Sequence, residues 1–120
     1  MKHLVFVYGT LLTNERNHYL IENAKLIDKG YIENFYMFNL GRYPGIQKGA
    51  GKVLGEVYEV DDETLAKLDM LEDEGTMYKK IIVATTLDNK QTVAAYVYEY
   101  ILNQHQNELD LEVYDWKKIK

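Results

Sequence analysis

Short runs of β-branched and aromatic residues, separated by turn residues, make up most of this chain and restrict the folds open to it. Such residues favour extended backbone, where their side chains pack on a pleated surface. The expected strands are Leu4–Tyr8, Gly30–Glu33, Phe35–Phe38, Val53–Val60, Tyr78–Thr86 and Thr92–Tyr100. Only two short helices interrupt them. The pattern therefore predicts an α+β fold with a mainly antiparallel sheet, which could close into a small barrel.

Two segments carry the signals of short helices. Arg16–Asn23 follows residues that can cap a helix N-terminus. A second helix is expected from Asp61 or Asp62 to Leu71, because acidic residues fill its first turn, where the helix dipole favours negative charge. Leucines recur at helical spacing along this segment, so one of its faces should pack against the core.

Glycine, proline and asparagine mark the breaks between these elements. Gly41–Lys52 holds four of the eight glycines and the only proline, and it is expected to be a loop. The strand signal before it is broken near Asn34, and a turn at Asp88–Lys90 joins the last two strands. The chain has 120 residues and no linker segment, so we expect a single domain over residues 1–120.

The composition excludes several kinds of chemistry. The chain has neither cysteine nor serine, which rules out disulfides, thiolate catalysis, iron–sulfur clusters and a serine triad. His3, His18 and His105 lack metal-binding spacing, so no zinc site is expected. A net charge of −5 argues against binding to nucleic acid. No apolar run reaches the roughly 18 residues of a membrane span, and the N-terminal one is too short for a signal peptide, so we expect a cytoplasmic protein.

The turn that follows the first expected strand is a candidate binding element. Tyr8, Gly9, Thr10 and Leu11 lie where a strand ends and a helix begins shortly after. Gly9 permits unusual backbone angles, and consecutive N–H groups in such a turn can converge on an anion. An ordinary strand-to-helix turn is the other interpretation of the same residues.

A cluster of acids at the end of the second expected helix is a candidate catalytic element. It consists of Asp69, Glu72, Asp73 and Glu74. The dipole of a helix is negative at this end, so the placement is unfavourable, and such conflicts often mark function. A carboxyl group near like charges or in an apolar pocket has a raised pKa, which suits a general base. A solvated acidic loop is the alternative, while the spacing argues against a calcium site.

Tyrosines are numerous, with 11 in the chain. Tyr96, Tyr98 and Tyr100 alternate along the last expected strand and therefore share one of its faces. A half-buried sheet face and a cleft for a small polar substrate are both consistent with this arrangement.

Several motifs follow one another in a particular order. They are Val7-Tyr8-Gly9-Thr10-Leu11, Asn17-His18, Tyr43-Pro44-Gly45, Val53-Leu54-Gly55-Glu56-Val57-Tyr58, and Leu68-Asp69-Met70-Leu71-Glu72 with Tyr78 six residues further on. Their order resembles that of the gamma-glutamylcyclotransferase-like superfamily, and more narrowly the gamma-glutamylamine cyclotransferase and AIG2-like proteins. The resemblance implies a small mixed, mainly antiparallel β-barrel with short flanking helices. It also implies an enzyme that needs no cofactor or metal, acts on a small γ-glutamyl substrate, and forms 5-oxoproline while releasing an amine.

The resemblance implies roles for particular residues. The family's catalytic glutamate falls on Glu72, although Glu74 is an alternative because Asp73-Glu74-Gly75 replaces the glycine that usually follows. The substrate-binding loop falls on Tyr8, Gly9, Thr10 and Leu11. Further candidates for contact with the substrate are Arg42, Tyr43, Tyr78 and Tyr96.

The implied reaction suits the residues that the chain contains. A γ-glutamyl substrate carries its own nucleophile, the α-amino group, so the protein need not supply one. Glu72 would take a proton from this amine and pass it to the leaving amine. Two other functions are open: a non-catalytic module that binds a small carboxylate, and an interaction domain that uses the tyrosine-rich face.

Overall fold

The structure is a computed structural model, and it describes residues 1–102, 109 and 111–119. These residues form strands, two short α-helices and a 3₁₀ helix. In chain order the elements are β1 (Lys2–Val7), η1 (His18–Ile21), β2 (Lys25–Asn39), β3 (Pro44–Asp61), α1 (Asp62–Leu71), β4 (Tyr78–Leu87), β5 (Thr92–Tyr100), β6 (Val113–Tyr114) and α2 (Trp116–Ile119).

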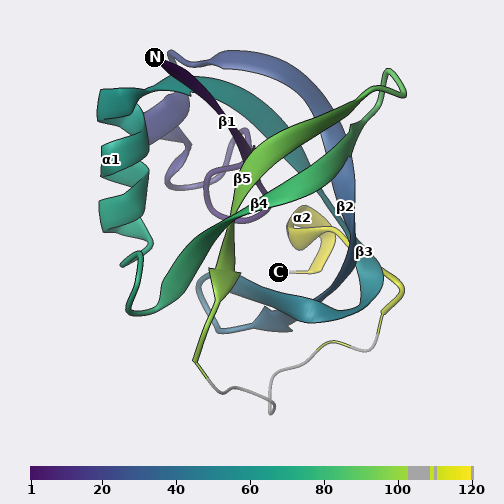
Figure 1. The fold of residues 1–120 in the computed structure, drawn as a ribbon. Coiled ribbons are helices and arrows are strands. Elements are labelled where there is room, and N and C mark those ends of the chain that lie inside the picture. The colour runs from purple at the N-terminus through teal and green to yellow at the C-terminus, as the bar shows by residue number, and fades with distance from the viewer. Residues whose placement is uncertain (103–108, 110, 120) are drawn as a thin grey trace.

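Five strands close into a barrel (Figure 1). Their order is β1-β5-β4-β2-β3, and β3 pairs back with β1. The β1–β5 pair is parallel and the other four pairs of the barrel are antiparallel. Helix α1 lies on the outside of the barrel, and β6 adds a short parallel pairing to β3. The predicted α+β class and the small mixed, mainly antiparallel barrel with short helices are therefore confirmed.

Strand β1 is the most buried part of the barrel. It lies between β3 and β5, and Val5 and Phe6, which point to opposite faces, are both fully buried. This is why its sequence reads as a continuous apolar run. Burial of β1 fixes the position of the turn that follows it, where the candidate binding residues lie.

Helix α1 begins and ends close to the predicted residues. The side chain of Asp61 accepts a hydrogen bond of 2.8 Å from the Thr64 N–H, which caps the N-terminus. Leu65 and Leu68 face the core. Glu72 is the residue that caps the C-terminus of the helix. The fold therefore presents Glu72 at the point where the chain leaves α1.

The prediction of a loop over Gly41–Lys52 is wrong. Strand β3 begins at Pro44 and pairs with β2 from the Asn39–Pro44 pair onward, so only residues 40–43 form the connection. Three of the four glycines, Gly45, Gly49 and Gly51, serve close packing instead, whereas Gly41 lies in the connection with a φ of 104°. A Cβ atom at Gly49 would lie 2.1 Å from the ring of Tyr36, so only glycine lets that ring cover the strand.

The prediction of a helix over Arg16–Asn23 is only partly correct, because the structure has a single 3₁₀ turn there, His18–Ile21. The expected break near Asn34 is confirmed as a bulge, since Asn34 has a φ of 69° and the β2–β3 register shifts at this point. The turn at Asp88–Lys90 is also confirmed, with a 2.9 Å hydrogen bond from the Lys90 N–H to the Leu87 carbonyl.

Within the described part of the chain, no helix is long and apolar enough to span a membrane.

Candidate active site

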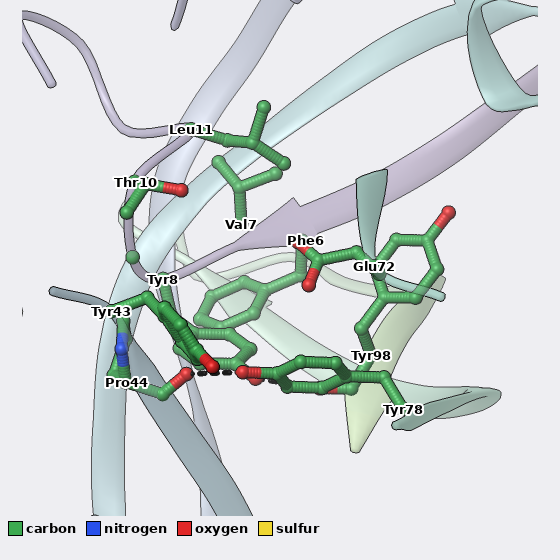
Figure 2. A pocket seen from close by; sticks show the side chains of 11 residues that line it. Phe6, Val7, Tyr8, Thr10, Leu11, Tyr43, Pro44, Glu72, Tyr78 and Tyr98 are labelled. Atoms are coloured by element: carbon green, nitrogen blue, oxygen red, sulfur yellow. Dashed lines mark hydrogen bonds between the residues drawn. The ribbon is translucent and has the colours of Figure 1, made fainter. Parts of the chain in front are cut away.

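A pocket lies at the end of β1, between the turn that follows this strand, the start of β3 and the end of α1 (Figure 2). Residues from five separate segments meet there. They are Phe6, Val7, Tyr8, Gly9, Thr10, Leu11, Tyr43, Pro44, Glu72, Tyr78 and Tyr98. The barrel thus brings together two elements that are distant in sequence, the turn after the first strand and the acidic end of α1.

Glu72 supplies the only carboxylate among the residues that line this pocket. Its side chain points into the pocket, with Phe6, Tyr78 and Tyr98 around it (Figure 2). No residue that the structure describes forms a hydrogen bond or an ion pair with its carboxyl group. Burial, together with the charge of Asp73, raises the pKa of Glu72 from 4.5 to about 7. Near neutral pH the group can therefore both accept and donate a proton.

The backbone after α1 fixes the direction of Glu72. Asp73 has a φ of 49° and Gly75 a φ of 92°, so the chain reverses sharply. The Met77 N–H donates a 2.9 Å hydrogen bond to the Asp73 carbonyl, which closes this turn. Glu72 is therefore held between a helix and a tight turn.

Two other acids of the cluster, Asp69 and Glu74, have hydrogen-bond partners of their own. Asp69 accepts hydrogen bonds from the Tyr98 hydroxyl at 2.7 Å and from Lys80 Nζ at 2.9 Å. Glu74 is exposed, and its carboxylate accepts a 3.1 Å hydrogen bond from the Lys80 N–H. Of the two glutamates considered from the sequence, only Glu72 lines the pocket.

The turn after β1 places backbone donors on the opposite side of the pocket. A 3.1 Å hydrogen bond from the Leu12 N–H to the Gly9 carbonyl closes the turn. The N–H groups of Gly9, Thr10 and Leu11 donate no hydrogen bond to any described residue. Consecutive free N–H groups of this kind are suited to bind a carboxylate or an oxyanion.

Two residues that follow the turn, Asn17 and His18, form hydrogen bonds to it. Asn17 contacts Thr10 twice: its N–H donates to the Thr10 carbonyl at 2.9 Å, and its side-chain amide donates to the Thr10 hydroxyl at 2.9 Å. The ring Nδ1 of His18 donates to the Leu11 carbonyl at 2.9 Å. These contacts give a physical reason for the Asn17-His18 motif. They also explain why this segment does not form a regular helix, since its polar groups bind the turn instead.

Tyrosines form the remaining wall. The Tyr8 hydroxyl donates to the Tyr98 carbonyl at 2.6 Å and the Tyr78 hydroxyl donates to the Pro44 carbonyl at 2.7 Å (Figure 2). Burial raises the pKa of Tyr8, Tyr78 and Tyr98 well above the usual value of a tyrosine. These hydroxyls stay protonated and paired, so they shape the pocket rather than transfer protons.

The candidate substrate contacts fall into two groups. Tyr43 and Tyr78 line the pocket, whereas Arg42 and Tyr96 do not. Arg42 is exposed, and Tyr96 packs beside His3 with their ring centroids 6.0 Å apart. His105 lies outside the described residues.

Sequence reasoning did not select Tyr98, Phe6, Val7 and Pro44 as pocket residues. The alternation of tyrosines in the last strand placed Tyr98 on the same face as Tyr96, but nothing in the spacing showed which of them meets the helix end.

Among the described residues, no group of three or more histidines and acids is arranged to hold a metal ion.

Solved structures with the same fold define the class to which the chain belongs. It superposes on an AIG2-like protein from Mus musculus with a TM-score of 0.83 and 28% identity, over 95% of this chain and 88% of the other. It superposes on the protein YtfP from Escherichia coli with a TM-score of 0.70 and 32% identity, over 98% of this chain and 99% of the other. The chain therefore has the AIG2-like barrel fold.

The sequence comparisons give the family. The family model described as "Gamma-glutamyl cyclotransferase, AIG2-like" matches residues 5–118. The Escherichia coli K12 protein named "Gamma-glutamylcyclotransferase family protein YtfP" is 41% identical over 81 residues, which cover 68% of this chain and 72% of that protein. The chain belongs to the AIG2-like gamma-glutamylcyclotransferase family, and the resemblance in motif order is confirmed.

Proposed function

We propose that this protein is an enzyme that cyclises a γ-glutamyl amine or peptide to 5-oxoproline and releases the free amine, without a cofactor. One observation carries the proposal: the carboxyl group of Glu72, with a pKa of about 7, shares a pocket with the N–H groups of Gly9, Thr10 and Leu11, and none of these groups is bonded to a residue that the structure describes. A proton-transfer group and anion-binding donors are the two elements that such a reaction needs.

The first step activates the nucleophile of the substrate. The α-amino group of a γ-glutamyl compound is mostly protonated near neutral pH and cannot attack in that form. Glu72 in its ionised form takes one proton from this group. The freed amine then attacks the γ-carbonyl carbon, and a new C–N bond closes a five-membered ring. The carbonyl oxygen becomes an oxyanion, which the N–H groups of the turn stabilise.

The second step expels the leaving amine. The ring nitrogen still carries two hydrogens and a positive charge after the attack. As the oxyanion returns to a carbonyl and the original C–N bond breaks, Glu72 gives its proton to the departing nitrogen. Glu72 then takes the surplus proton from the ring nitrogen and passes it to the released amine, which leaves as an ammonium ion. No atom is lost or gained overall: one amide is exchanged for another within the same molecule.

The proposal is tested by screening γ-glutamyl compounds for release of 5-oxoproline. Glutathione-type peptides, γ-glutamyl-lysine and γ-glutamylated small amines cover the main kinds of leaving group. We expect Glu72→Gln to lower kcat by ~10³-fold, within the range for loss of a general acid–base group. The matched control is Glu74→Gln, two residues away, which removes the same charge from an exposed position and should keep the parental rate.

Calorimetry separates the enzyme from a binding module. Binding of γ-glutamyl compounds without any 5-oxoproline would contradict the proposal and favour a non-catalytic function. Parental activity in Glu72→Gln with loss in Glu74→Gln would instead move the proton-transfer role to Glu74.

A further inference from the structure

A second carboxylate, more deeply buried than that of Glu72, lies close to the turn, and the reaction as proposed does not use it. Glu56, in β3, is 5% exposed. Its Oε1 accepts hydrogen bonds from the Thr13 N–H at 3.0 Å, the Thr13 hydroxyl at 3.0 Å and the Tyr58 hydroxyl at 3.1 Å. Among the described residues, no cation forms an ion pair with it.

The position of Glu56 in the sheet connects it to both ends of the turn. Its backbone pairs with Val7, the last residue of β1. Its carboxylate binds Thr13, which follows Val7 by six residues. Residues 8–12 therefore form a loop whose two ends are both attached to a single residue of β3. The N–H groups of Gly9, Thr10 and Leu11 lie within this loop.

Tyr58 extends the same attachment. Glu56 and Tyr58 alternate with Val57 and so share one face of β3. The ring of Tyr58 contacts the ring of His18, with the centroids 5.7 Å apart, and His18 holds the Leu11 carbonyl. The contacts thus run from Glu56 to the backbone of the turn by two routes, through Thr13 and through His18.

We propose that Glu56 is a positioning residue that fixes the substrate-binding turn relative to Glu72. This inference rests on the proposed function, because it assigns the turn to substrate binding. An ionised carboxylate has acceptors only, so it can take three donors at once, which an amide or a hydroxyl cannot do without bringing donors of its own. Burying such a group without a counter-ion is costly, and the three hydrogen bonds offset that cost.

The effect of this positioning should appear in catalysis. A displacement of about 1 Å far from the reacting atoms can lower a rate by ~10²-fold. We expect Glu56→Ala to lower kcat/KM by ~10²-fold. Glu56→Gln, which keeps one carbonyl acceptor for the Thr13 N–H, should recover most of that loss, and Thr13→Val, which removes only the hydroxyl donor, should have an intermediate effect.

The experiment measures 5-oxoproline release, the dissociation constant of 5-oxoproline and the backbone amide chemical shifts of residues 9–11 in the full chain. The matched control is Glu59→Gln in the same strand, for which the structure shows no hydrogen bond to the turn. A loss of fold alone would reduce the active fraction, but it would not change the dissociation constant of the molecules that remain folded. We therefore expect weaker 5-oxoproline binding and shifted amide signals in Glu56→Ala, but not in the control.

The outcomes separate this inference from the function it rests on. If the parent is active and Glu56→Ala keeps its kcat/KM and its amide shifts, the positioning role is wrong while the proposed function stands. If the parent releases no 5-oxoproline from any compound, the proposed function fails. The amide shifts still decide the structural part in that case: unchanged signals for residues 9–11 in Glu56→Ala overturn it, and shifted signals support it.

Discussion

Two glutamates close to the turn that follows β1 have opposite surroundings. Glu56, next to Thr13, has three hydrogen-bond donors on one carboxylate oxygen. Glu72, across the pocket from Gly9 and Leu11, has no hydrogen-bond partner among the described residues and a pKa raised to about 7 by burial and by the charge of Asp73. The carboxyl group of Glu56 thus holds neighbouring donors in place, whereas that of Glu72 can bind a proton near neutral pH.

The difference shows how a small barrel can separate structure from chemistry. A carboxylate oxygen that accepts several hydrogen bonds is suited to hold the backbone in place. A carboxylate that is buried without partners exchanges protons easily, at a cost to stability. The comparison therefore predicts that the same substitution has opposite consequences for stability at the two positions.

The largest expected effect is on the free energy of unfolding of Glu72→Gln and Glu56→Gln. Because the pKa of Glu72 is raised from 4.5 to about 7, the folded state binds its proton more tightly than the unfolded state. The resulting stabilisation is complete below about pH 4.5 and is lost as the pH rises to about 7. Glutamine cannot ionise, so Glu72→Gln should be more stable than the parent at pH 8, by at most ~3 kcal/mol.

Glu56→Gln should instead lower the free energy of unfolding by ~1–3 kcal/mol at pH 8, because the three donors that bind Oε1 lose a charged acceptor and keep only the neutral amide oxygen. Urea denaturation at pH 4 and pH 8 measures both variants against the parent. The gain for Glu72→Gln should vanish at pH 4. If both variants were more stable than the parent at pH 8, or both less stable, the predicted difference between the two positions would be wrong.

The next largest effect is expected on kcat/KM, from a substitution at Gly9, which lines the pocket. A Cβ atom at Gly9 would lie 2.6 Å from Cγ of Pro44, so Gly9→Ala must displace the turn or the start of β3. We expect kcat/KM to fall by ~10²-fold. The double variant Gly9→Ala with Pro44→Ala removes the ring carbons that clash and keeps the Pro44 carbonyl, which accepts the Tyr78 hydrogen bond. It should recover activity, and equal losses in the single and double variants would show that backbone position at Gly9 is not what matters.

Local signals predicted much of the fold. The N-cap at Asp61, the break at Asn34 and the turn at Asp88–Lys90 depend on neighbouring residues alone, and all three are present. The segment Gly41–Lys52 was predicted wrongly because three of its four glycines are explained by contacts with other strands. Gly45, for example, packs against Tyr100, which is 55 residues away in the chain. Single-sequence reasoning cannot see such contacts.

The candidate site shows the same division. Motif order and an unfavourable run of acids at a helix end singled out Glu72 and the turn after the first strand. Tyr98 lines the pocket and Tyr96 does not, because only the Tyr98 hydroxyl bonds to α1, at Asp69. That contact depends on how the barrel closes, which the spacing of the tyrosines does not show. Glu56 lay within a motif already noted, but its role depends on Thr13, 43 residues earlier, and no local pattern connects the two.

The smallest expected effect concerns the charge beside Glu72. Burial is the main cause of the raised pKa of Glu72, and the exposed carboxylate of Asp73 is the second. Asp73→Asn keeps a residue that tolerates the positive φ of this position and removes the charge. The acid limb of the pH profile of kcat/KM should move to lower pH, which raises activity at pH 6 about twofold to threefold and leaves the rate above pH 8 unchanged. Asp88→Asn, which removes an equal charge in the β4–β5 turn, is the control; if its profile matches that of Asp73→Asn, the ionisation of Glu72 does not set the acid limb.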